Sequence, residues 1–181
     1  FTGLSLVTGS TITQTGAGSI NTTGTLTVNS SGGQTLNGAN TVGGFNATNS
    51  ASGAISFTNT ASTLTLNNIT QSAPSAPVTI SNAGNLAIRG TINASGNTLT
   101  LAATGSTSDL VIQALAGPSN VQSATMNLTA GNDLRIQGGT GTNAFAQAFA
   151  TGSQTVNANT ISLIGGSVGK PRLRDALPCH R

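Results

Sequence analysis

The feature that most constrains this chain is a series of apolar pairs whose two members lie two positions apart. Residues at that spacing point to the same face of a β-strand, whereas a helix repeats its apolar positions every three to four residues. Their neighbours are mostly Thr, Ser, Asn and Ala, which suit a solvent-facing side, and Gly and Asn gather between the pairs, where turns need left-handed backbone. The eleven pairs are Leu4/Leu6, Leu26/Val28, Ile55/Phe57, Leu64/Leu66, Val78/Ile80, Leu86/Ile88, Leu99/Leu101, Leu110/Ile112, Met126/Leu128, Leu134/Ile136 and Ile161/Leu163. The pattern predicts short strands in a regular series.

The pairs also recur at a regular interval along the chain. One series begins at Leu64, Leu86, Leu110, Leu134 and Ile161, with steps of 22, 24, 24 and 27 residues. Short strands with a period in the low twenties are typical of a β-solenoid, in which each strand pairs with the strand one coil away. An antiparallel sandwich would leave this period unexplained.

We therefore predict an all-β fold: a single right-handed parallel β-helix of about eight coils, each of roughly 20–27 residues, over residues 1–169. Inward side chains would stack into aliphatic ladders, and Asn side chains at the corners would bond to their copies in the next coil. The predicted core ladder consists of Leu64, Leu86, Leu110, Leu134 and Ile161.

The composition argues against side-chain catalysis. The chain has no Glu, Trp or Tyr, its acids are Asp109, Asp133 and Asp175, and its one histidine is His180. The paired carboxylates of a glycosidase, the ligands of a zinc site and the base of a hydrolase triad therefore have few or no candidates. We expect no enzymatic activity, no cofactor and no metal site. Residues 131–133, Gly-Asn-Asp, match part of a calcium-binding turn, but that motif needs an Asp from successive turns.

The charge is concentrated at one end of the chain. Residues 1–88 carry no charged side chain, the next four charges cancel, and the net charge of +3 comes from residues 170–181. These twelve residues contain no Gly, Ser, Thr or Asn, so we predict a basic tail that is disordered or not part of the fold. The single cysteine, Cys179, also lies there, and a body without cysteine suits an exported protein. Nucleic-acid binding uses a basic face on a folded element, so we expect no nucleic-acid partner and no membrane insertion.

Two surface patterns have an ordinary structural explanation. Thr-x-Thr occurs at residues 11–13, 25–27, 63–65 and 98–100, with spacings of 14, 38 and 35 residues. Stacked Thr-x-Thr rows can bind ice, but these intervals do not supply one set per coil, which favours polar strand filler. Arg89 and Arg135 hold similar places in two Gly-Asn repeats, which predicts outward arginines at a coil edge.

Residues 144–150 contain the one apolar spacing of four, between Phe145 and Phe149. A short helical turn would fit this spacing. We favour a lateral loop whose phenylalanines are tucked onto the rod.

The repeats at residues 84–90, 130–139 and 153–166 resemble the passenger repeats of filamentous-haemagglutinin-type exoproteins. These are bacterial surface and secreted proteins of the two-partner secretion and autotransporter groups. The resemblance covers roughly residues 1–169 and implies a right-handed β-helix, export across a Gram-negative envelope, and roles in adhesion or biofilms. The secretion domain of that family carries an Asn-Pro turn, and no Asn-Pro occurs here, so we expect a piece of the rod.

These observations predict a structural or adhesive rod segment of a bacterial surface or secreted protein, or an extracellular fibre subunit, that displays Thr/Ser/Asn-rich faces. Its expected partner is a host or neighbouring-cell surface, or further copies stacked end to end into filaments, because no capping segment is visible. The alternative is an ice-binding β-solenoid. A polysaccharide-degrading β-helix enzyme is less favoured, because the two acids of the body are too few for that chemistry.

Overall fold

A computed structural model describes residues 2–167, which contain strands and turns but no helix. All fourteen strands belong to one sheet and pair in parallel, which confirms the predicted all-β parallel fold. The prediction for residues 170–181 lies outside the described residues. The strands are β1 (Gly3–Val7), β2 (Ile12–Thr13), β3 (Asn21–Ser30), β4 (Gln34–Asn49), β5 (Ile55–Asn59), β6 (Thr63–Gln71), β7 (Val78–Asn82), β8 (Asn85–Ala103), β9 (Leu110–Gln113), β10 (Ser119–Ala130), β11 (Asp133–Gln137), β12 (Ala146–Ala150), β13 (Gln154–Asn157) and β14 (Thr160–Ile164).

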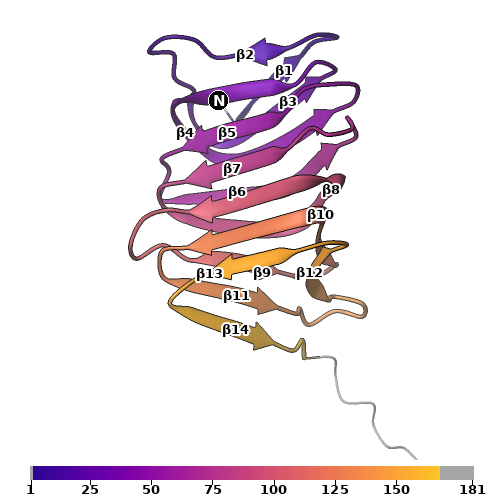
Figure 1. Cartoon of the computed structure of the whole chain (residues 1–181). Helices are drawn as coiled ribbons and strands as arrows, with labels where there is room; N and C mark the ends of the chain where they lie inside the picture. Colours follow the sequence, from indigo (N-terminus) through magenta and orange to yellow (C-terminus); the bar gives the residue numbers. More distant parts are fainter. Residues whose placement is uncertain (1, 168–181) are drawn as a thin grey trace, which may run out of the picture.

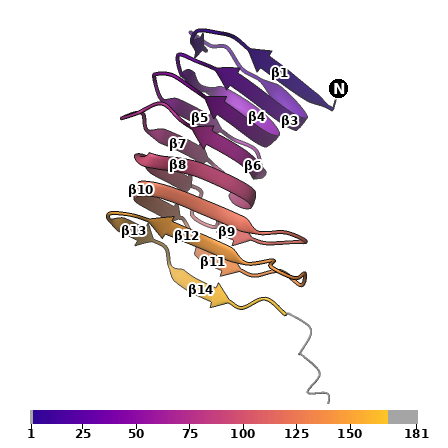
Figure 2. The ribbon, with the colours of Figure 1, turned by 90° about the vertical axis from the view of Figure 1, so that its right-hand side faces the viewer.

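The sheet winds into a stack of coils (Figures 1 and 2). Along one ladder of paired residues, from Leu4 to Leu163, successive members are 22, 19, 21, 22, 24, 24 and 27 residues apart. The solenoid therefore has about seven turns rather than the predicted eight. The last coils are the longest because loops leave the rod after β9 and β11, so fewer turns fit into the chain.

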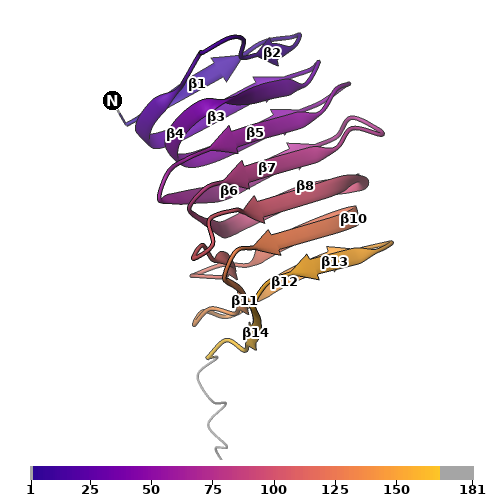
Figure 3. The ribbon, with the colours of Figure 1, turned by 60° about the vertical axis from the view of Figure 1, so that its left-hand side comes forward.

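Each central coil has three sides, which we call walls A, B and C. Wall A stacks β9, β11 and β14 on residues 86–88 of β8. Wall B stacks β12 on residues 119–123 of β10, which lie on residues 91–94 of β8. Wall C stacks β2, the start of β4, β5, β7, the ends of β8 and β10, and β13. The long strands bend around corners and so belong to more than one wall (Figure 3).

Inward side chains form a continuous apolar column. On wall A the members Leu64, Leu86, Leu110, Leu134 and Ile161 pair in register from coil to coil. The four leucines are at most 1% exposed, whereas Ile161 is 55% exposed because it lies in the last described coil. Nearer the other end, the rings of Phe45 and Phe57 stack with their centroids 4.2 Å apart and fill the space between walls.

A buried polar ladder follows the corner between walls C and A. Asn40, Asn59 and Asn82 are in register and at most 1% exposed. The Asn59 amide donates to Asn82 Oδ1 at 2.9 Å and to the Val42 carbonyl at 3.1 Å, and its Oδ1 accepts from the Val42 N–H at 2.8 Å. The predicted stacking of corner asparagines is thus confirmed. In the next coil Ala103 takes this position, so the ladder is confined to the first half of the rod.

The Gly-Asn repeats lie at the same corner. A Cβ at Gly84 would collide with the Ser62 carbonyl oxygen of the preceding coil, and one at Gly131 would collide with the Gly105 carbonyl oxygen. Glycine is therefore required at this corner by the close approach of neighbouring coils.

Candidate binding surfaces

The outer face of wall C carries a row of small polar side chains, one from each coil. Its strands alternate inward apolar with outward polar residues, so the residue between two core positions faces solvent. We call this set the wall C row: Thr13, Thr35, Ser56, Thr79, Thr100, Asn127 and Thr155, which pair in register along the rod. Six of these seven side chains carry a hydroxyl.

The rows beside it are also uncharged and carry mostly hydroxyl groups. On one side lie Thr58, Ser81, Ala102, Thr129 and Asn157, and on the other side Thr98 pairs with Thr125. Within residues 2–167, the outward positions of these wall C strands include no charged residue. In the same range, side-chain hydrogen bonds to neighbouring side chains involve only Ser56, Thr100 and Asn127 of the row. The remaining row hydroxyls are free to bind water or a ligand.

The four Thr-x-Thr motifs divide between two walls. Thr13 and Thr100 belong to the wall C row, whereas Thr25 and Thr65, which are in register through Gly44, lie on wall A. The wall C row consists of single residues that lie 21 to 28 positions apart in the sequence, so the Thr-x-Thr motif does not identify it. Four of its seven members are the middle residues of apolar pairs, such as Thr79 between Val78 and Ile80, but the pairs of wall A have the same local pattern, so strand pairing is needed to identify the row.

Wall A differs from wall C because all four charges of the described residues lie on it or at its edge. Its outward row reads Thr65, Ala87, Val111, Arg135 and Ser162. Arg135 pairs with Val111, and Val111 pairs with Ala87, so Arg135 corresponds in register to Ala87. Arg89 lies two residues after Ala87 on β8 and therefore stands at another position. Arg89 is exposed and Arg135 is partly buried. The two arginines occupy different register positions because register follows the buried leucines, and the second Gly-Asn repeat carries one extra residue before its leucine.

The two described acids lie at a corner of wall A, where Asp109 bonds to the neighbouring coils. Asp109 Oδ1 accepts from the Asn132 side-chain amide at 2.9 Å and from the Asp133 N–H at 3.2 Å, and the Asp109 N–H donates to Asn85 Oδ1 at 2.9 Å. These bonds link consecutive coils at one corner. Within residues 2–167, no three His, Cys, Asp or Glu side chains come together in a way that could hold a metal ion.

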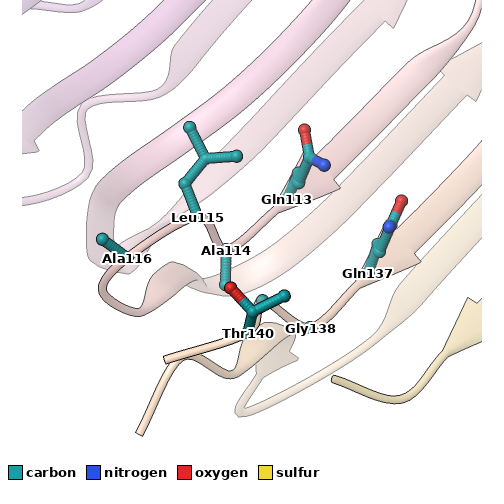
Figure 4. A pocket seen from close by; sticks show the side chains of 8 residues that line it. Gln113, Ala114, Leu115, Ala116, Gln137, Gly138 and Thr140 are labelled. Atoms are coloured by element: carbon teal, nitrogen blue, oxygen red, sulfur yellow. The ribbon is translucent and has the colours of Figure 1, made fainter. Parts of the chain in front are cut away.

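Two loops after β9 and β11 enclose a shallow hollow of about 280 Å³ (Figure 4). Gln113 and Gln137, which pair in register, line it together with Leu115, which is 46% exposed. The lining residues are amide, aliphatic, glycine and threonine, without a titratable side chain. The hollow can offer hydrogen bonds and a small apolar contact but no acid or base.

The Ala/Phe segment forms a strand, and the two predictions for it are wrong. Ala146, Ala148 and Ala150 of β12 pack against the core. Phe145 and Phe149 are 47% and 54% exposed. A spacing of four corresponds to two pleats of a strand as well as to one helical turn, so both rings lie on the outer face.

The last described coil leaves apolar side chains exposed at the end of the column. Leu163 is 76% exposed and Ile161 is 55% exposed. Together with Leu134 and Val156 they line a hollow of about 390 Å³. At the other end, Leu4 is only partly buried. Both cross-sections have the geometry that another coil could cover.

No family model, curated protein or solved structure matches this chain. Among residues 2–167, no helix is long and apolar enough to cross a membrane. The function therefore has to be inferred from the surfaces described above.

Proposed function

We propose that this chain is an adhesive rod segment of a bacterial surface or secreted protein. The observation that supports this most directly is the unbroken ladder from Leu4 to Leu163. Seven steps of about 4.8 Å give a rod about 34 Å long. The resemblance of residues 84–90 and 130–139 to filamentous-haemagglutinin-type repeats supports export and adhesion. The rod would hold binding surfaces away from the cell that makes it.

Adhesion would arise from many weak contacts. Walls B and C present hydroxyl and amide groups, such as Thr48, Asn93 and Gln122 on wall B, in register along the rod. Uncharged donors and acceptors of this kind suit hydrogen bonding to the glycans of a host or neighbouring cell. Each contact is weak alone, and display in many copies raises the total affinity through effective concentration.

The adhesive role can be tested with protein-coated beads. Beads coated with the full chain should be retained on a cell monolayer more strongly than beads coated with an inert protein of equal size, while the free chain binds weakly. Antibodies against the chain should also label intact cells that produce it. Equal retention of both kinds of bead, or labelling only after the cells are broken, would contradict the proposal.

We also propose that the role is not enzymatic. The described residues contain two acids, and the Asp109 carboxylate is already engaged in corner hydrogen bonds. Asp133 therefore has no free second carboxylate with which to form a catalytic acid–base pair. A reducing-sugar assay on uronic-acid polymers tests this, because a release of sugar ends above the buffer control would contradict it.

A fibre subunit is the second candidate, and the exposed ends of the core favour it. A second copy that stacked its first coil on Leu163 and Ile161 would continue the wall A ladder and bury both side chains. Such a head-to-tail contact does not close on itself, so it would produce filaments.

A further inference from the structure

We propose that the outer face of wall C is an ice-binding surface, an activity additional to the glycan contacts proposed above for walls B and C. The inference starts from the regularity of the face. The wall C row repeats once per coil, at about 4.8 Å along the rod, and outward neighbours on one strand lie about 6.6 Å apart. Side chains at these two intervals, most of which carry a hydroxyl, form a rectangular net that Asn127, Ala102 and Asn157 interrupt, and a face of an ice crystal also presents a regular two-dimensional repeat.

The face is held rigidly. Val78, Ile80, Leu99 and Leu101, which flank Thr79 and Thr100 on their strands, are completely buried. The pairings β5–β7, β7–β8 and β10–β13 contain no register shift, so the rows continue across these coils without a bulge. A rigid net does not lose conformational freedom when it meets a solid, and this favours binding to a periodic surface.

The chemistry of the face suits a lattice of water. A threonine hydroxyl both donates and accepts, as a water molecule does, and its methyl group fills the space between hydroxyls. Thr79 is exposed and its hydroxyl has no side-chain partner among residues 2–167, so it can bond to ordered water. A charged side chain would instead hold its own hydration shell, and within the described residues wall C has none.

The other walls lack this combination. Wall A carries Arg135 and Val111 in its outward row, and wall B carries Phe149 in line with Gln122 and Asn93. A crystalline polysaccharide is the competing periodic solid, and its binding sites use exposed aromatic rings that stack on sugars. None of the four phenylalanines of residues 2–167 lies on the outer face of wall C, because two are buried and two lie on or next to wall B. The observations therefore favour ice.

Ice-affinity partitioning of the full chain tests the proposal. A slowly growing ice front should enrich the parent chain in the ice fraction, and thermal hysteresis should be measurable. Thr79→Lys, at the centre of the row, should return both readouts to the level of an inert protein. The matched control is Thr48→Lys, which puts the same charge on an exposed threonine of wall B and should match the parent in both ice readouts. Circular dichroism checks that both variants keep the β-sheet spectrum.

Three results would overturn the proposal. The parent chain could remain in the liquid, Thr48→Lys could lose ice affinity as fully as Thr79→Lys, or the parent could sediment with microcrystalline cellulose or chitin in a Thr79-dependent way without affecting ice. None of these results would affect the retention of coated beads on cells, so a failure here is distinguishable from a failure of the adhesive role.

Discussion

Replacing Leu110 with alanine tests how much of the rod's stability depends on the wall A ladder. Leu110 is completely buried and pairs with Leu86 on one side and Leu134 on the other, which are at most 1% exposed. Hydrogen bonds hold neighbouring coils about 4.8 Å apart, so the ladder cannot close around the missing side chain. The loss should therefore lie in the upper part of the range of about 2–5 kcal/mol seen for buried leucines. Leu110→Asp should cost more, because it buries an unpaired charge.

Ile161→Ala is the matched control, since Ile161 stands in the same ladder but is 55% exposed. Less apolar area is returned to water there, and the loss should stay below about 1.5 kcal/mol. Urea unfolding followed by circular dichroism measures the unfolding free energy of both variants. Equal losses at the two positions, or a loss below about 1 kcal/mol for Leu110→Ala, would refute the ladder as the source of stability.

Three further predictions concern the asparagine ladder at the corner of walls C and A, residues 170–181, and the exposed end of the apolar column. Asn59→Ala should lower the unfolding free energy by about 1–3 kcal/mol for each polar group left unpaired, because Asn82 Oδ1 and the Val42 N–H lose their partner; an unchanged urea midpoint would contradict this. Deleting residues 170–181, which lack the apolar pairs and turn residues of the body, should leave the urea midpoint unaltered and lower the isoelectric point, whereas a lower midpoint would assign them a part in the last coil. In sedimentation velocity, the chain should associate as its concentration rises and Leu163→Lys should weaken the association; a strictly monomeric parent at millimolar concentration would exclude stacking.

Much of the fold could be predicted from the sequence because two periods coincide in it. The spacing of two identifies strands and their inward residues, and the spacing in the low twenties identifies coils, so β8 and β9 lie where Leu86 and Leu110 predict them. The number of turns was harder to predict from the sequence, because loops of different length change the number of residues in each coil. Phe149 was predicted to lie in a lateral loop against the rod but lies on the outer face of β12, because a spacing of four also fits two pleats of a strand.

The candidate binding face could not be predicted in the same way. An apolar pair on wall A and one on wall C look alike locally, as Leu86/Ile88 and Leu99/Leu101 show. Only the pairing of strands reveals which middle residues stack on one another. Thr79 and Thr100 therefore belong to a row that becomes visible in three dimensions, while Thr65, in an identical local pattern, faces away on wall A.

The direction of the backbone hydrogen bonds determines how this rod would respond to force. They join one coil to the next and so lie along the rod axis, as in the bond from the Ile55 N–H to the Pro77 carbonyl at 3.0 Å. A pull on the two chain ends loads the bonds of one terminal coil at a time, so coils would peel away singly. A released coil of 22 residues extends by about 70 Å. Single-molecule stretching should record steps of that size, and under tension the stack would act as a tether that lengthens in increments while its remaining coils stay folded.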